Sequence, residues 1–397
     1  MKRLLDDVCA KFTIPQDLRD KGIYPYYKPV ATGQNPVVTM ADGKRVLMFG
    51  SNSYLGLSDD PRLKEAAMAA VKKYGTSCSG SRFLNGTLDL HEELEAKLAE
   101  FTGKEAAVTF STGFQVNLGV VSCLGVRGSY ILLDETDHAC IIDGARLSFG
   151  TVYKFRHNDM ESLEHKLKVC APDAMKLIVV DGVYSMLGDL CKLPEICDLC
   201  EKYGASVMVD DAHGMGVFGE NGSGTASHFG LTDRVDLIMS TFSKSFGSLG
   251  GFIAGNKGVV DYIRNTARSL MFSASMTPAT VAAALKALEI MKEEPQRREH
   301  LWELTRYAWK RFRENGFDIN ATDSPIIPLM VRDSEKAMRA VIEAYNQGLF
   351  ITPVVAPAVA EKDALIRFAL MATHSFNQVD EAVDKLTRIF KHFEIIE

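Results

Sequence analysis

Short apolar runs separated by polar or mixed stretches fill the chain from about residue 105 to residue 255. Several of these runs are apolar without interruption, as expected for strands that are buried on both faces of a sheet. The strand candidates are EAAVTFS (105–111), SYILLD (129–134), TVYKFRH (151–157), KLIVVDG (176–182), SVMVDDA (206–212), DLIMSTF (236–242) and GFIAG (251–255). Strands that alternate with helical stretches in this way predict an α/β domain with a mainly parallel sheet.

The last hundred residues mix strand-like and helix-like segments. Residues 334–348 and 375–393 have apolar positions at helical spacing, and Ser375 and Gln378 are spaced as a capping box. The strand-like runs are SPIIPLMV (324–331), LFITPVV (349–355) and ALIRFAL (364–370). This region predicts a small α+β domain, joined to the first domain by a long helical stretch near residues 277–316.

The chain before the alternating region predicts an arm, one short strand and one helix. The strand lies in KRVLMFGSNSYLGL (44–57), and the helix lies in DDPRLKEAAMAAVKKYG (59–75), with Pro61 in its first turn and Gly75 at its end. The predicted organisation is an N-terminal arm and short strand at 1–57, a large domain at 58–290 and a small C-terminal domain at 291–397.

Composition argues against several classes of function. The 397 residues carry a formal net charge of -6, so the chain has no broad basic field for binding nucleic acid. No apolar run approaches the roughly 20 residues that span a bilayer. Asp6 and Asp7 interrupt the apolar start of the chain, so we expect no signal peptide and a cytoplasmic location. Peripheral contact with the inner face of the membrane is left open.

The eight cysteines are scattered along the chain, which is typical of the reduced thiols of a cytosolic protein. One C-x-x-C pair, Cys197 and Cys200, falls on the core face of a helix predicted between Pro194 and Gly204. A zinc site would need a second pair of ligands, and a redox role would need a thioredoxin-like context. The sequence around the pair shows neither, and we predict no metal site.

GMGVFG (214–219) follows a predicted strand and fits the G-x-G-x-x-G pattern of dinucleotide-binding proteins. That fingerprint also needs a helix that begins at the glycines and an acidic residue about 20 positions later. The next residues, ENGSGTASHFG (220–230), are rich in turn formers, and neither Asp233 nor Asp236 clearly ends a second strand. We therefore expect no NAD(P) site at these glycines.

Polar residues gather where the predicted strands end, at 111–112, 134–138, 181–185, 210–213 and 241–244. In a sheet of parallel strands, ligands bind at the edge where the carboxyl ends of the strands meet. The polar residues of this chain are therefore expected to form one site at that edge.

Two of these strand ends carry the residue types that pyridoxal 5'-phosphate requires. Asp210 ends one apolar strand, and Lys244 follows the next one beside Thr241, Ser243 and Ser245. A lysine amine forms a Schiff base with the cofactor's aldehyde, and an acid keeps the ring nitrogen protonated so that the ring acts as an electron sink. Hydroxyl groups and glycine N–H groups can hold the phosphate. Pyridoxal phosphate is therefore the predicted cofactor.

TFSKSFGSLGGFIAG (241–255) resembles the lysine motif of the α-oxoamine synthases, which are fold-type-I pyridoxal phosphate enzymes. Five further segments match that family in order and spacing: GSRFLNGTLDLHEELE, FSTGFQVNLG, DETDHACIIDG, DGVYSMLGD and VDDAHGMGVFG. The resemblance extends from NSYLGL (52–57) to LIRFALMATH (365–374). It implies an aminotransferase-like α/β fold, in which a large domain has a mainly parallel seven-stranded sheet between helices and a small α+β domain follows.

The resemblance also implies roles for residues around the cofactor ring. Lys244 resembles the lysine that binds the cofactor covalently, and Asp210 matches the acid that pairs with the pyridinium nitrogen. His213 matches the histidine that hydrogen-bonds the phenolic oxygen. His138 matches the histidine that stacks on the ring, and Ser185 matches a serine beside the ring oxygen.

Other positions resemble the family's phosphate site. Gly113, Phe114, Thr241 and Ser243 match residues that hold the phosphate within one subunit. Ser273 lies where the family reaches into the phosphate site of a second subunit, so a homodimer with shared active sites is implied, although Ser273 could also be a plain strand residue. The other histidines are interpreted as ordinary residues: His91, His157, His165, His228, His300, His374 and His392.

The family condenses an amino acid with an acyl-CoA and releases carbon dioxide. The resemblance implies that the freed amine of Lys244 accepts the Cα proton, that His138 can hold the substrate carboxylate early in the reaction, and that Asn52 contacts the substrate. It also implies that Arg367 clamps the amino-acid carboxylate. A structural ion pair for Arg367 and a turn role for Asn52 are the alternatives.

The motifs look closest to those of the bacterial family members that use L-serine and a long-chain acyl-CoA, palmitoyl-CoA. The apolar stretch FITPVVAPAVA (350–360) either lines an acyl channel or belongs to the core, and it lacks the arginine that some family members carry there. The alternatives in the family are glycine with acetyl-CoA, glycine with succinyl-CoA and alanine with a pimeloyl thioester. An aminotransferase of the same fold and a non-catalytic partner subunit are the alternatives outside this activity.

Overall fold

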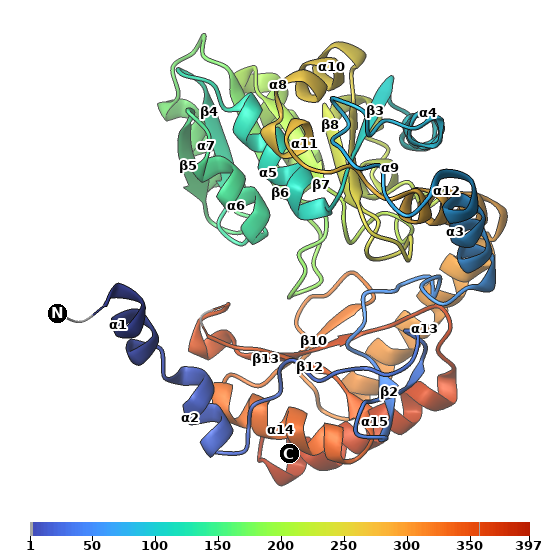
Figure 1. The fold of residues 1–397 in the computed structure, drawn as a ribbon. Coiled ribbons are helices and arrows are strands. Elements are labelled where there is room, and N and C mark those ends of the chain that lie inside the picture. Colours follow the sequence, from blue (N-terminus) through green and yellow to red (C-terminus); the bar gives the residue numbers. More distant parts are fainter. Residues whose placement is uncertain (1–2, 357) are drawn as a thin grey trace.

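The computed structural model describes residues 3–356 and 358–397, so Met1 and Lys2 of the predicted arm and Pro357 of the apolar stretch lie outside the described residues. All seven predicted strands of the central region form one sheet in the order β3-β9-β8-β7-β6-β4-β5 (Figure 1). Their bounds are β3 (Ala106–Phe110), β4 (Tyr130–Asp134), β5 (Thr151–Phe155), β6 (Lys176–Asp181), β7 (Ser206–Asp210), β8 (Leu237–Thr241) and β9 (Gly251–Gly255).

Strand β9 is antiparallel to both of its neighbours, and the pairs from β8 through β7, β6 and β4 to β5 are parallel. The predicted sheet is therefore confirmed. Helices flank it, with bounds α4 (Asp89–Thr102), α5 (Gly113–Leu124), α6 (Ala139–Arg146), α7 (Met160–Val169), α8 (Leu193–Tyr203), α9 (Thr225–His228), α10 (Lys257–Thr266) and α11 (Arg268–Met271).

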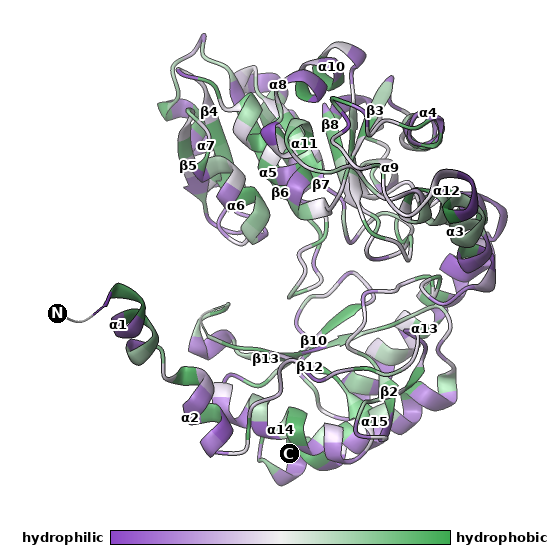
Figure 2. Cartoon of the chain, in the orientation of Figure 1, coloured by the Kyte–Doolittle hydropathy of each residue, from purple (hydrophilic) through white to green (hydrophobic). Residues whose placement is uncertain are grey.

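Both faces of this sheet are buried, because successive side chains of a strand point to opposite faces. In β6, Ile178 and Val180 pack in the core that includes α4, α7 and α8, while Val179 between them packs in the core that includes α5, α6 and α10. Figure 2 accordingly shows the central strands coloured as mainly hydrophobic. The uninterrupted apolar runs of the sequence follow from this double burial.

Three helices connect the large sheet to the rest of the molecule. Helix α3 (Pro61–Tyr74) begins at the N-cap Asp60, whose side chain accepts the N–H of Arg62, and ends at Gly75, as the sequence predicts. It packs along α12 (Pro278–Glu293). The helical stretch predicted near 277–316 is two helices, because Pro295 begins α13 (Pro295–Glu314) directly after Glu294.

The last hundred residues form a small α+β region, as predicted. Its sheet has the order β10-β13-β12, with all neighbours antiparallel, and the capping box of Ser375 and Gln378 is present at the start of the last helix. The bounds are β10 (Ile326–Met330), α14 (Ser334–Asn346), β11 (Leu349–Phe350), β12 (Thr352–Val354), β13 (Leu365–Ala369) and α15 (Phe376–His392).

Strands near the end of the N-terminal segment pack against this C-terminal region. Strand β2 (Arg45–Met48) pairs with β1 (Val37–Thr39) on one side and in parallel with β11 on the other. The ring of Phe49 stacks on Phe368 of β13 at a centroid distance of 4.2 Å. The domain boundaries after residues 57 and 290 stay predictions.

Two helices that the sequence analysis did not predict precede β1, namely α1 (Leu4–Lys11) and α2 (Ile14–Asp20). No residue of either helix is buried, and α1 stands away from the body in Figure 1. Of the helices that the structure describes, none has both the length and the apolar composition that crossing a bilayer requires.

Candidate active site

A cavity of about 260 Å³ lies at the carboxyl ends of the central strands, where the sequence places its polar residues. Most of the predicted site residues line it: Gly113, Phe114, His138, Ser185, Asp210, His213, Thr241, Ser243 and Lys244. They come from the ends of β6, β7 and β8 and from the starts of α5 and α6. The predicted site is therefore brought together by the order of the sheet, since these strands are neighbours.

Lys244 follows β8 and reaches this cavity. Burial lowers the pKa of its amine to about 8, although the carboxylates of Asp210 and Asp181 oppose that shift. An amine with this pKa is partly unprotonated near neutral pH, which a nucleophile or a general base requires.

Asp210 ends β7 and is only 4% exposed. The amide of Asn117, in α5, donates to one of its carboxylate oxygens at 2.5 Å, and the N–H of Ala212 donates to the other at 3.0 Å. These two donors hold the carboxylate in place at the cavity wall. Asn117 was not among the predicted site residues, although it lies in the matching segment FSTGFQVNLG.

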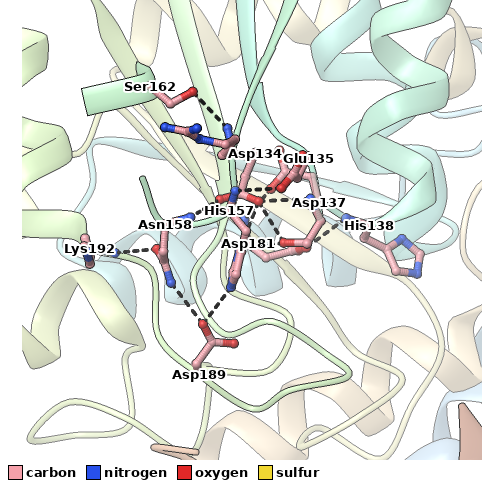
Figure 3. A network of polar contacts seen from close by, with 12 residues as sticks. Asp134, Glu135, Asp137, His138, His157, Asn158, Ser162, Asp181, Asp189 and Lys192 are labelled. Atoms are coloured by element: carbon pink, nitrogen blue, oxygen red, sulfur yellow. Dashed lines mark hydrogen bonds and ion pairs between the residues drawn. The ribbon is translucent and has the colours of Figure 1, made fainter. Parts of the chain in front are cut away.

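His138 is the N-cap of α6, and its N–H donates to Asp181 at 2.8 Å. The N–H of Asp181 in turn donates to a side-chain oxygen of Asp137 at 3.1 Å (Figure 3). Burial raises the pKa of both carboxyl groups well above the ordinary value, and the neighbouring carboxylates add to the shift. Burial and, less strongly, the charge of Lys244 lower the pKa of His138, with Asp210 opposing them, so its ring faces the cavity in the neutral form.

The start of α5 and the end of β8 form a cradle for an anion. Thr112 caps α5, and the first N–H groups of that helix, from Gly113 and Phe114, have no partner within the helix. Thr241 and Ser243 place their hydroxyl oxygens 2.9 Å apart at the cavity. A Cβ on Gly113 would lie 2.7 Å from the side chain of Thr241, so only glycine fits between the two segments.

Arg367 of β13 lies next to this cavity. It is 7% exposed, and its Nε donates to the carbonyl oxygen of Ser185 at 2.7 Å. Its Nη2 donates to the hydroxyl of Tyr54 at 3.2 Å. The oxygen of that hydroxyl lies 3.5 Å from the side-chain oxygen of Asn52. The structure thus places Arg367 and Asn52 around Tyr54, and it pairs Arg367 with neutral oxygens rather than with a carboxylate.

The model of the family described as Aminotransferase class I and II matches residues 44–386 of this chain. The chain belongs to this family. It is 58% identical over 394 residues to a serine palmitoyltransferase from Sphingobacterium spiritivorum, with 99% of this chain and 98% of the relative covered. It is 55% identical over 393 residues to a serine palmitoyltransferase from Bacteroides thetaiotaomicron, with 99% and 100% covered.

Solved structures agree with these relatives. A serine palmitoyltransferase from Sphingomonas wittichii is similar at a TM-score of 0.96 and 34% identity, with 100% of both chains covered. Among the sequence relatives, an 8-amino-7-oxononanoate synthase from Petrotoga mobilis is 43% identical over 376 residues, covering 94% of this chain and 95% of the relative. The resemblance to the α-oxoamine synthases and the aminotransferase-like fold are therefore confirmed for this family member.

Ser273, like Asn52 and Arg367, is a predicted residue that does not line the cavity. Its hydroxyl accepts a hydrogen bond from the amide of Gln115, in the first turn of α5, at 3.0 Å. The adjacent carbonyl of Ala274 bonds Ser111 at the end of β3. Ser273 thus sits beside the anion cradle rather than in it, and its role toward a second subunit stays a prediction.

The glycine-rich segment GMGVFG and the C-x-x-C pair both lie outside the cavity lining. GMGVFG begins no helix: residues 211–219 form turns after β7, and the buried Asp211 accepts the N–H of Thr225 across them. Cys197 and Cys200 are buried in the core on one face of α8, which ends at Gly204 as predicted.

His157, which the sequence analysis interpreted as an ordinary residue, belongs to the polar network behind the cavity. Its ring nitrogens lie 3.1 Å from Asp134 and 2.9 Å from Asp189 (Figure 3). Burial alone would lower the pKa of His157, but the two carboxylates raise it to about 10. Its sequence context, FRHND, gives no sign of these partners, because both lie more than 20 positions away.

Proposed function

We propose that this protein condenses L-serine with palmitoyl-CoA to give 3-ketosphinganine, free CoA and carbon dioxide, the first step of sphingolipid synthesis. The proposal rests on the cavity that Lys244 and Asp210 both line. It is supported by the 58% identity to a serine palmitoyltransferase along nearly the full length of the chain. The identity to an 8-amino-7-oxononanoate synthase is lower, at 43%, and supports that alternative less.

The residues of the cavity fit pyridoxal phosphate. Lys244 offers a partly unprotonated amine, and Asp210 offers a fixed carboxylate for a ring nitrogen. The start of α5, together with Thr241 and Ser243, offers an anion cradle. A related serine palmitoyltransferase, at a TM-score of 0.96 and 33% identity, has a solved structure with this cofactor. When bound, the cofactor supplies a ring that stabilises negative charge on the Cα of the amino acid.

Side chains of this protein carry out proton transfer and substrate binding. Lys244 holds and moves the Cα proton, because an amine with a pKa of about 8 accepts a proton and returns it near neutral pH. Arg367 binds the serine carboxylate through guanidinium donors beyond those used by Ser185 and Tyr54. His138 closes one side of the cavity, and its neutral ring can hold the carboxylate early in the reaction.

The proposed enzyme works as a homodimer with shared active sites. Phe83, Leu84 and Phe272 are large apolar side chains that are more than half exposed, and the bridge between Ser81 and Ala274 brings their segments together beside the anion cradle. A second copy of the chain would cover these side chains and bring its own Ser273 close to the site. The cytoplasmic location, and contact with the inner face of the membrane, stay predictions.

A product screen tests the activity. Purified protein with pyridoxal phosphate is offered serine, glycine, alanine or threonine, each with palmitoyl-CoA or acetyl-CoA, while free CoA and the cofactor's absorbance are recorded. Serine with palmitoyl-CoA should release CoA fastest. Glycine perturbing the absorbance while serine does not would overturn the choice of substrate, and amino-group transfer without CoA release would favour an aminotransferase.

Replacing the lysine tests the site itself. Lys244→Ala should lose the absorbance of the covalently bound cofactor and reduce turnover at least about 1,000-fold, because both the covalent anchor and the base are removed. Lys257→Ala, at an exposed lysine at the start of α10, is the matched control and should behave as the unaltered protein. Turnover that survives in Lys244→Ala would contradict the assignment.

A further inference from the structure

Tyr54 is a buried tyrosine whose hydroxyl has three polar neighbours. It lies between β2 and α3 and is 1% exposed. Its hydroxyl oxygen is 2.6 Å from Nδ1 of His213, 3.2 Å from Nη2 of Arg367 and 3.5 Å from Oδ1 of Asn52. His213 lies in the turn after β7 of the large sheet and Arg367 lies in β13 of the small sheet, so this one hydroxyl joins both regions.

The direction of these hydrogen bonds follows from the chemistry of the partners. A guanidinium has donors and no acceptor, so the oxygen of Tyr54 must accept from Arg367. The single hydroxyl proton is then free for His213 or Asn52. The distance of 2.6 Å to His213 is that of a strong hydrogen bond, whereas 3.5 Å to Asn52 is at the outer limit.

The proton of Tyr54 therefore points at Nδ1 of His213, which must carry a lone pair. Burial lowers the pKa of His213 well below its ordinary value, and the charges of Lys244 and Arg367 add to that shift, so the ring is neutral. A neutral ring with a bare Nδ1 carries its proton on Nε2. Since His213 lines the cavity and Nδ1 is used by Tyr54, Nε2–H is the donor that the ring offers to a bound ligand.

We propose that Tyr54 is a positioning residue that holds His213 in the Nε2–H tautomer. In the chain of hydrogen bonds that results, Arg367 donates to Tyr54 and Tyr54 donates to His213. The use of this donor rests on the proposed function, in which His213 faces an oxygen of the cofactor ring. The tautomer itself does not depend on that function, because Arg367, Tyr54 and His213 are all part of this chain.

The chain of hydrogen bonds ties the two halves of the site together. An Nε2–H group stabilises a negatively charged ring oxygen, whereas the opposite tautomer would direct a lone pair at that oxygen. Arg367, which is proposed to bind the serine carboxylate, has one of its donors held by the same hydroxyl. Loss of the hydroxyl therefore affects a cofactor contact and a substrate contact together.

Nuclear magnetic resonance of the full chain with ¹⁵N-labelled histidine tests the tautomer, with and without pyridoxal phosphate. The His213 signals are assigned by their absence in His213→Gln. We expect neutral, Nε2-protonated His213 in the unaltered protein in both states, and a mixture of tautomers in Tyr54→Phe, which keeps the ring and its packing. Tyr345→Phe is the control, since its hydroxyl bonds Asp42 in the small region at 2.9 Å.

Binding of serine to the pyridoxal phosphate-loaded protein, followed by the cofactor's absorbance, gives the second readout. Tyr54→Phe should weaken serine binding about tenfold, as expected for one hydrogen bond to a charged group, while the KM for palmitoyl-CoA stays unchanged. An Nδ1-protonated His213 in the unaltered protein, or a tautomer that Tyr54→Phe leaves unchanged, would overturn the inference. If His213 has the expected tautomer but no mixture with serine releases CoA, the result would count against the proposed substrates and not against the role of Tyr54.

Discussion

The carboxylate of Asp210 shows how much of the site is decided by side chains behind the cavity wall. Its position at a strand end made it predictable, as did the position of Lys244 after the next strand, because ligands bind where the carboxyl ends of parallel strands meet. The role of His138 followed from the resemblance to the α-oxoamine synthases. Asn117 and Tyr54 were not predicted. The hydrogen-bond partner of a polar residue within an apolar segment cannot be predicted from the sequence when the partner lies in a distant segment.

Removing the support of Asp210 should loosen the cofactor. Asn117→Ala leaves one carboxylate oxygen without its 2.5 Å donor, and we expect the dissociation constant of pyridoxal phosphate to rise about 10-fold to 100-fold, the range for a hydrogen bond to a charged group. Equilibrium dialysis with absorbance detection measures it. Asn265→Ala, which removes an exposed amide on α10, should have no effect, and an equal affinity in both variants would refute the role of Asn117.

At the scale of the elements, the strands were predictable and several connections were not. The seven strands of the large sheet are continuous apolar runs because both of their faces are buried. Helices α1 and α2 were missed because neither has a buried face to impose an apolar period on its sequence. The connection after β6 was also unpredictable, since it is held by His157, whose partners are remote in sequence.

His157 should contribute a pH-dependent share of the stability. The folded-state pKa of about 10 is above the unfolded value near 6.5, so the stabilisation is complete below pH 6.5 and is lost as the pH rises toward 10. His157→Gln should therefore lower the free energy of unfolding by about 2 to 3 kcal/mol at pH 6 and by much less at pH 10. Urea unfolding at both values measures it.

The control for this prediction is His165→Gln, at an exposed histidine on the neighbouring helix α7. It should change the free energy of unfolding by less than about 0.5 kcal/mol at either pH. A loss in His157→Gln that is equally large at pH 6 and pH 10 would mean that the ring acts through packing, and that its charge contributes nothing.

Across the whole molecule, the first 57 residues are divided between a dispensable part and an essential part. Helix α1 buries no residue, so deleting residues 1–12 should change the melting temperature by no more than about 2 °C. Deleting residues 1–50 removes β2 and Phe49, which is fully buried between Phe368 and His374. This longer deletion should abolish the cooperative unfolding transition of the small region in calorimetry, and an intact transition would contradict the packing described above.

The pairing of β2 with β11 joins residue 47 to residue 349, and this has a consequence for how the protein is made. A ribosome adds about 5 to 20 residues each second, so β2 emerges long before its partner strand exists. The large sheet, with strands between residues 106 and 255, can assemble during that interval. The edge of the N-terminal strand that pairs with β11 therefore stays unpaired until residues 349 and 350 have been made.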